Sequence, residues 1–331
     1  MLMLSEEPVQ VEGVEALLNL SKQYIPKDQA QNLVLKVIQV IMDRISPQSE
    51  HQEMEEVKEK AKIAILIIVQ KFADADVFEK EQCQNFLENH LEDIQDGMLF
   101  KIKKFVMPAL LAVSKHLSQD AFIEKVYTGT FQPFNSDEIW GVRKVCIENL
   151  ASLMKYLPYN DIPRITECID FFKRCLNDSN RWVKNQALIQ FGPIVHQIYL
   201  KLEPVADGNK DAAVAQLKEL INQMCLGYYD VKLIFGEKDD LENSLMEKLD
   251  DYSFMQNKTD DVDKVKYYWA YNMPCALLVN GRSAFWFSHM KNIYELLYKD
   301  VLINLRTTIA ASFKEVIEIL EIDKMESKEE R

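Results

Sequence analysis

One spacing of apolar residues recurs along most of this chain and strongly limits its fold. Apolar residues stand three, four or seven positions apart, as Val57, Ala61, Ile65 and Ile68 do. This spacing places them on one face of an α-helix, whereas the alternation typical of strands is nearly absent. Only 9 Gly and 10 Pro occur in 331 residues, so few positions require tight turns. The sequence therefore predicts an all-α protein.

The same periodicity predicts where the helices lie. Short polar turns separate them, and the expected ranges are 9–24, 28–45, 49–73, 77–95, 98–117, 118–127, 138–157, 161–176, 181–199, 210–228, 264–279, 283–298 and 301–321. Three prolines, Pro108, Pro193 and Pro274, fall inside apolar helical runs, where we expect them to bend the helix.

A second pattern begins alternate helices. An Asp is followed at the fifth position by an aliphatic residue and at the sixth by a base, in Asp137/Val142/Arg143, Asp178/Val183/Lys184 and Asp300/Leu305/Arg306. The first two copies lie 41 positions apart, and the third follows after about three such periods. A looser copy, Ile102 and Lys103, precedes them by 40 positions. A period near 40 is typical of two-helix repeats.

This pattern has a physical explanation. The Asp can accept hydrogen bonds from free amides at the start of a helix, where its charge also suits the helix dipole. The aliphatic residue would enter the layer between hairpins, and the base could reach the Asp of an adjacent repeat. Such partly exposed ion pairs contribute only about 0–1 kcal/mol each, so they would determine register more than stability.

The pattern resembles the HEAT repeat. Segments 139–146 (IWGVRKVC) and 179–193 (SNRWVK, then QFGP) are similar to consecutive repeats of the protein phosphatase 4 regulatory subunit 1 family. Segments 270–277 (AYNMPCAL) and 294–297 (YELL), followed by Leu305-Arg306, resemble the start of that family's second block of repeats. The resemblance implies a right-handed α-α superhelix of HEAT, or armadillo-type, repeats.

We expect four parts in the chain. They are an N-terminal block of HEAT repeats (1–200), an acidic connector with some helix (201–263), a C-terminal block (264–321) and a frayed tail (322–331). The connector holds 15 Asp and Glu against 7 Lys, and a run of solvated charge of this kind favours a linking segment.

Composition argues against several classes of function. A net charge of −13 has the wrong sign for binding nucleic acid or an anionic membrane surface. The longest apolar stretch, 63–69, is far too short to span a membrane, and the first residues do not resemble a signal peptide. Six scattered cysteines fit a reducing compartment. We expect a cytoplasmic protein, with presence in the nucleus also open.

No catalytic or cofactor motif is apparent. The glycines are too widely spaced for a dinucleotide-binding or phosphate-binding loop, and the histidines form no metal-ligand pair. Asp74 and Asp76 hint at a calcium loop, but the rest of that motif is missing, so we interpret them as a turn. We therefore expect no enzyme activity, no cofactor and no bound metal.

Aromatic and basic residues near the starts of two repeat helices are the candidate partner-binding site. They are Trp140, Arg143, Lys144, Arg181, Trp182 and Lys184, a composition typical of binding hot spots. The alternative is that both tryptophans pack between repeats and the bases beside them complete the repeat ladder. We assign Asp137, Asp178, Asp300 and Arg306 to this ladder. A second aromatic group, Trp269, Phe285, Trp286, Phe287 and Tyr294, is better explained as core.

The resemblance implies a non-catalytic scaffold that binds the catalytic subunit of a serine/threonine phosphatase, of type 4 or type 2A-like, and directs its activity. Substrate proteins are a second class of expected partner. Two alternatives remain open: a HEAT adaptor of another class, such as a transport receptor or assembly scaffold, and an all-α enzyme whose carboxylates converge only in space.

Overall fold

The computed structural model describes residues 5–46, 54–95, 98–202, 212–230, 232–235 and 260–329. Within these ranges every regular element is a helix, so the chain is all-α, as the apolar periodicity predicts. The helices form two compact units, Met1–Tyr156 (unit 1) and Leu157–Arg331 (unit 2). The boundary between the units, after Tyr156, differs from the boundaries of the predicted repeat blocks 1–200 and 264–321. The assignment of those blocks as HEAT repeats stays a prediction.

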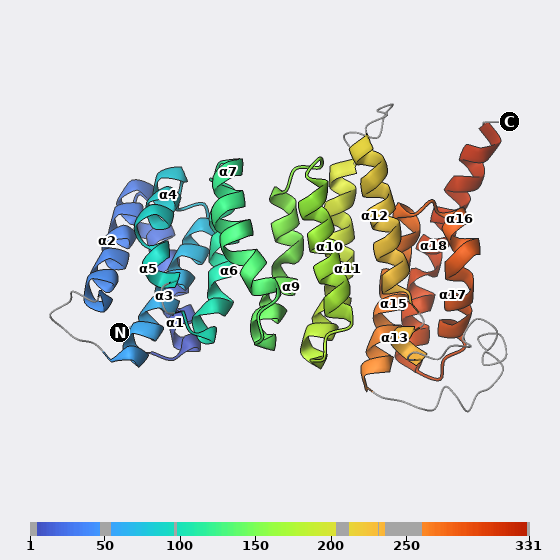
Figure 1. The fold of residues 1–331 in the computed structure, drawn as a ribbon, viewed down its shortest axis with the longest axis horizontal. Coiled ribbons are helices and arrows are strands. Elements are labelled where there is room, and N and C mark those ends of the chain that lie inside the picture. The colour runs from blue at the N-terminus through green and yellow to red at the C-terminus, as the bar shows by residue number, and fades with distance from the viewer. Residues whose placement is uncertain are drawn as a thin grey trace. The chain divides into compact units, whose positions relative to one another are not determined.

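Unit 1 is built around a row of helices. Its elements are α1 (Glu7–Tyr24), α2 (Lys27–Ile45), α3 (Glu55–Asp74), α4 (Lys80–Asn89), α5 (Leu91–Gln95), α6 (Phe100–Ser114), α7 (Gln119–Ala121), the π-helix η2 (Phe122–Phe131), α8 (Gln132–Asn135) and α9 (Trp140–Tyr156). Helices α1, α3, α6 and α9 pack on one another in that order and form the central row (Figure 1). The other helices flank this row.

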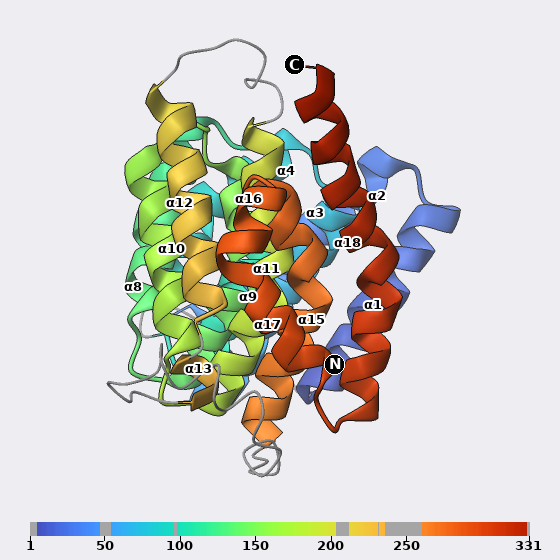
Figure 2. The ribbon, with the colours of Figure 1, turned by 90° about the vertical axis from the view of Figure 1, so that its right-hand side faces the viewer.

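Unit 2 repeats the arrangement. Its elements are α10 (Ile162–Leu176), α11 (Arg181–Leu202), α12 (Ala212–Tyr228), α13 (Lys232–Phe235), α15 (Asp260–Val279), α16 (Ser283–Phe285), the π-helix η5 (Trp286–Met290), α17 (Lys291–Tyr298) and α18 (Ile303–Glu329). Here α11, α15 and α18 form the central row, and α12 packs on α10 and α11 (Figure 2).

Apolar side chains hold each central row together. In α3, Ala61, Ile65 and Ile68 have no exposed surface, and they are the residues whose spacing predicted this helix. In unit 2, Phe191 of α11 and Met273 of α15 are equally buried. Full burial of one large apolar side chain contributes about 1.5–3 kcal/mol, so these stripes dominate the stability of the rows. Pro108, Pro193 and Pro274 all lie inside central-row helices.

The predicted connector contributes to the core of unit 2. Helix α12, which lies within it, ends at Tyr228, and both Tyr228 and Tyr229 are buried. Tyr228 stacks on Phe191 with ring centroids 3.8 Å apart, and its carbonyl accepts a hydrogen bond from Nε1 of Trp269 at 2.7 Å. Residues 203–211, 231 and 236–259 of the connector lie outside the described ranges. The tail expected at 322–331 is helical as far as Glu329.

One predicted helix ends too early. The expected range 118–127 continues as η2 and α8 to Asn135, although this stretch contains Gly129 and Pro133, which have low helix propensity. Phe131 is completely buried and Phe134 is 5% exposed. Burial of these two rings outweighs the unfavourable helix propensities of Gly129 and Pro133.

Candidate functional site at the repeat edge

The Asp137 cluster joins α6 to the start of α9. Oδ1 of Asp137 accepts a hydrogen bond from the Ile139 amide at 2.8 Å, and Oδ2 lies 2.6 Å from Nζ of Lys103. Arg143 donates to the carbonyl oxygens of Asp137 at 2.7 Å and Glu138 at 2.9 Å. Burial alone would raise the pKa of Asp137, but the bonds from Lys103 and the Ile139 amide hold that pKa below its usual value.

Asp300 builds the same cluster in unit 2. Its Oδ1 accepts from the Leu302 amide at 2.9 Å, and its Oδ2 lies 2.7 Å from Nζ of Lys266 on α15. Arg306 donates to the Asp300 carbonyl at 2.7 Å. This pair is more deeply buried than its counterpart, because the side chains of Lys266 and Asp300 are 9% and 1% exposed.

The two clusters are related by a constant shift in sequence. An offset of 163 residues relates all three pairs: Lys103 to Lys266, Asp137 to Asp300, and Arg143 to Arg306. Because the offset is the same for each pair, the two segments align without insertions or deletions. The base at the sixth position forms two kinds of contact. Lys103 reaches the Asp of the next repeat, as expected, and Arg143 and Arg306 donate to the backbone of their own loop.

Sequence reasoning missed Lys266. Val265 and Lys266 stand 40 positions before Leu305 and Arg306, and Asp260 stands five before Val265, so the full repeat pattern was present. Asp260 lies inside the predicted acidic connector (201–263), so this copy was not recognised as part of the repeat.

In the copy that begins at Asp178, the Asp side chain contacts the backbone of its own loop. Its Oδ1 accepts from the Asn180 amide at 2.8 Å, and Oδ1 of Asn180 accepts from the Trp182 amide at 2.9 Å. The aliphatic partner Val183 has no exposed surface, and the base Lys184 is exposed. This copy thus leaves a lysine available on the surface of α11.

The two candidate tryptophans lie at the surface of their units. Trp140 is 44% exposed on α9, and Trp182 is 48% exposed on α11. The guanidinium carbon of the exposed Arg181 lies 4.9 Å from the centre of the Trp182 ring, within the range of cation–π attraction. An aromatic ring with a cation on it, half open to solvent, is chemically suited to bind another protein.

The surface around Trp140 extends to α6. Leu99 and Phe100, at the start of α6, are 56% and 49% exposed, and Ile139 is 40% exposed. Leu99 and Phe100 precede Ile139 and Trp140 by 40 positions, at the starts of neighbouring central-row helices. We call these four residues the unit 1 edge; nearby, Lys144 forms an ion pair with Glu148.

The six candidate residues are divided between the units. Trp140, Arg143 and Lys144 belong to unit 1, while Arg181, Trp182 and Lys184 belong to unit 2 and form the unit 2 edge. In the second aromatic group, Trp269 and Phe285 are core residues, whereas Phe287 is 72% exposed.

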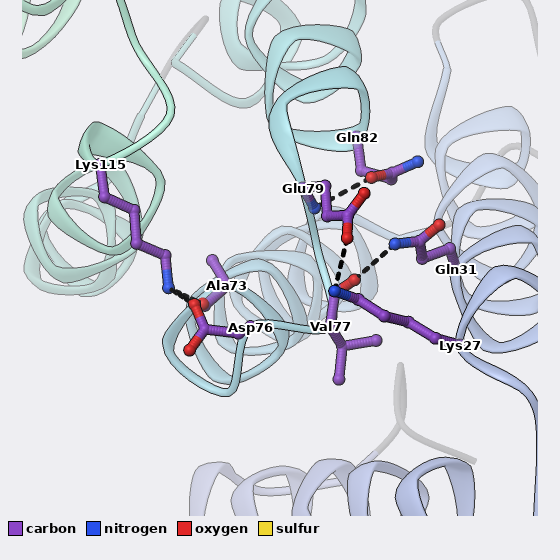
Figure 3. Close-up of polar contacts among 8 residues, drawn as sticks. All are labelled: Lys27, Gln31, Ala73, Asp76, Val77, Glu79, Gln82 and Lys115. Carbon is purple, nitrogen blue, oxygen red and sulfur yellow. Dashed lines mark hydrogen bonds and ion pairs between the residues drawn. The ribbon is translucent and has the colours of Figure 1, made fainter.

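The loop with Asp74 and Asp76 is a turn held by neighbouring helices (Figure 3). Asp76 has a positive φ of 55° and forms an ion pair with Lys115, which also donates to the Ala73 carbonyl at 2.6 Å. On the other side, Gln31 of α2 donates to the Val77 carbonyl at 2.7 Å. A lysine ammonium therefore occupies the place beside Asp76 that a cation would take.

The described part of the chain contains no group of three or more His, Cys, Asp or Glu side chains that could hold a metal ion. In the same residues, no helix combines the length and apolar character needed to cross a membrane.

Comparisons with known proteins give little further information. No protein-family model matches the sequence, and no curated protein matches it. The matching solved structures include the crystal structure of an engineered protein, which is 13% identical over 95% of this chain and 76% of that chain. Its TM-score of 0.35 is too low to support an argument about fold or function.

Proposed function

We propose that this chain is a non-catalytic HEAT-repeat scaffold, a right-handed superhelix of armadillo-type hairpins. In this proposal it binds the catalytic subunit of a serine/threonine protein phosphatase, type 4 or type 2A-like, and directs its activity. The chemistry would belong to the catalytic subunit, and this chain would position it.

The observation that carries the proposal is the exposure of Trp140 and Trp182. Both stand near the starts of central-row helices, beside bases, in segments that resemble the phosphatase regulatory family. Half-exposed tryptophans contribute little to a core, whereas tryptophan and arginine are enriched at the centres of protein interfaces. The chain as a whole has a net charge of −13. The exposed bases of the unit 2 edge, Arg181 and Lys184, therefore differ in sign from the net charge of the chain.

The repeat clusters support the scaffold part of the proposal. Lys103–Asp137 and Lys266–Asp300 link successive central-row helices at equivalent positions. Ion pairs at equivalent positions of stacked hairpins fix the register of one hairpin on the next. A fixed register holds the residues of each edge in place within their own unit.

Binding to purified catalytic subunits tests the proposal. Type 4 and type 2A catalytic subunits would be titrated onto the immobilised chain, and we expect saturable binding of at least one. Arg181→Glu with Lys184→Glu should weaken it by about tenfold or more, because both bases are exposed and reversal adds repulsion. Arg143 is a poorer choice for this test, since it also holds the Asp137 loop.

A matched variant controls for net charge. Lys218→Glu with Lys291→Glu makes the same charge change on flanking helices of unit 2, where both lysines are exposed, and should bind like the unaltered chain. If neither catalytic subunit binds, the phosphatase assignment is wrong and the other adaptor classes take its place. If both double variants lose binding equally, the edge residues are not the site.

A further inference from the structure

A groove runs along the flanking helices of unit 1. It lies between α4–α5 on one side and α7–η2 on the other, and its volume is about 680 Å³. Its lining includes Leu87, Glu88, Leu91, Glu92, Ala121 and Gly129. The central-row residues that form the unit 1 edge take no part in it.

The groove has an apolar floor and an acidic rim. Leu87 and Leu91 are 8% and 3% exposed, so they form the base, while Glu88, Glu92 and Glu124 are exposed. Glu124 is paired with Lys125 at 2.9 Å. Among the residues that the structure describes, neither Glu88 nor Glu92 forms an ion pair, which leaves two carboxylates four positions apart on one wall.

The opposite wall is a π-helix of ten residues, an uncommon element that is frequent at functional sites. Oγ1 of Thr130 donates to the Lys125 carbonyl five residues earlier at 3.0 Å, and it accepts from Gln95 across the groove at 3.3 Å. A Cβ atom at Gly129 would lie 3.0 Å from the Glu124 carbonyl oxygen, so glycine fits this wall best. Hydrogen bonds of Thr130 therefore join the two walls of the groove.

Unit 2 has a groove beside the segment that corresponds to η2, with different chemistry. It has a volume of about 280 Å³ and lies between α12 and η5–α17. Ser288 and Asn292 line it and correspond to Lys125 and Gly129 through the offset of 163. Its lining is mostly apolar, with Asp230 as the one carboxylate. Of the residues that line this second groove, the described part of unit 2 thus supplies a single carboxylate.

We propose that the unit 1 groove binds a basic segment of a partner protein. An apolar side chain of that segment packs on Leu87 and Leu91, and two lysines or arginines pair with Glu88 and Glu92. Glu88 lies near the end of α4 and Glu92 near the start of α5, so this wall offers one carboxylate to each of two bases on a partner segment. Charge complementarity selects this occupant over an acidic or wholly apolar one. The groove shares no residue with the unit 1 edge or the unit 2 edge, and this proposal does not depend on phosphatase binding.

The test uses the full chain and a defined probe. A fluorescein-labelled 14-residue helical peptide of leucine and lysine, with lysines four apart, would be titrated by anisotropy at physiological salt, beside the same peptide with glutamate in place of lysine. We expect binding of the lysine peptide alone. Glu88→Gln with Glu92→Gln should weaken it by about tenfold, as expected for two exposed ion pairs at about 0.7 kcal/mol each.

Two further variants separate groove binding from general attraction to an acidic protein. Glu81→Gln with Glu315→Gln removes the same charge at exposed positions outside the groove and should leave affinity within twofold. Ala121→Leu fills the groove without changing charge and should weaken binding at least fivefold with an unchanged unfolding temperature. Hydrogen exchange on the complex should show protection in 84–95 and 117–129.

Several outcomes would overturn the proposal. These are no binding of the lysine peptide, equal binding of the glutamate peptide, equal weakening by the two charge-removing variants, no effect of Ala121→Leu, and protection confined to unit 2. All of them leave the phosphatase proposal untouched, since its residues are not altered.

Discussion

Nζ of Lys266 lies 2.7 Å from Oδ2 of Asp300, with both side chains almost completely buried. The same separation of 34 residues joins Lys103 to Asp137 at 2.6 Å in unit 1, where Lys103 is 26% exposed. In each case a lysine of one central-row helix forms an ion pair with the aspartate in the loop before the next central-row helix. The two pairs are chemically alike but differ in burial, so they should differ in what their loss costs.

Asp300→Ala should destabilise the protein more than Asp137→Ala. Removing Asp300 leaves the Lys266 ammonium buried without its partner, which costs about 3–5 kcal/mol. Lys103 can be rehydrated when Asp137 is removed, so we expect a loss of about 1–2 kcal/mol, mostly from the lost helix cap. Chemical unfolding followed by circular dichroism measures both.

Asp300→Asn separates the charge from the cap. Asparagine can still accept from the Leu302 amide but cannot balance the charge of Lys266, so its loss of stability should approach that of Asp300→Ala. Equal losses for Asp300→Ala and Asp137→Ala would mean that burial of the ion pair does not determine its contribution.

At Gly192 in α11, helix propensity and packing predict opposite effects of substitution by alanine. Propensity alone favours alanine in a helix interior by about 1 kcal/mol. However, a Cβ atom here would lie 2.8 Å from Oδ1 of Asn272. Asn272 cannot easily turn away, because its Nδ2 donates to Oη of Tyr228 at 2.9 Å and to the Tyr268 carbonyl at 3.0 Å. We expect Gly192→Ala to destabilise unit 2.

A double-mutant cycle tests this explanation. Asn272→Ala removes the clashing side chain, so Gly192→Ala should become neutral or stabilising by up to about 1 kcal/mol in that background. If the two changes are additive in unfolding free energy, Asn272 is not what disfavours alanine at this position.

Lys201 should make stability depend on pH. Burial lowers the pKa of Lys201 to about 8, whereas an unfolded lysine has a pKa of about 10.4. Between these values the unfolded chain binds more protons than the folded chain, so the contribution of Lys201 to the unfolding free energy increases as pH rises from about 8 to about 10. Lys201→Met removes this contribution.

The measurement is the difference in unfolding free energy between the unaltered chain and Lys201→Met at pH 7 and pH 10. Groups shared by both proteins cancel in this difference, and we expect the unaltered chain to gain relative to the variant at the higher pH. A difference that does not change with pH would place the ammonium of Lys201 in water rather than in the interior.

The sequence carried enough information for the fold class and for most helix positions. Helices α2 and α10 begin and end within one residue of the predicted 28–45 and 161–176, because their apolar faces are regular and polar turns bound them. The π-helix was not predictable in this way. It depends on burial of Phe131 and Phe134, which overrides the local signals of Gly129 and Pro133.

The candidate site was predictable only in part. The repeat pattern identified Asp137, Asp300 and their arginines, since these contacts are local to one loop. The contacts around Tyr228 could not be derived, because they join residues about 40 apart and Tyr228 lies in the predicted connector, which was not expected to contribute to a core. Exposure of Trp140 and Trp182 was also undetermined, since a periodic aromatic residue fits a core and a surface equally well.

Stability measurements on tryptophan variants can separate those two roles. Trp269 has no exposed surface, and Trp269→Ala should cost about 3–5 kcal/mol. Trp140→Ala and Trp182→Ala should each cost less than about 1 kcal/mol, because about half of each ring already contacts solvent. The same two variants should weaken binding of the phosphatase catalytic subunit. If Trp182→Ala instead destabilises the chain as much as Trp269→Ala does, Trp182 acts in packing, and the unit 2 edge loses the residue that makes it a candidate interface.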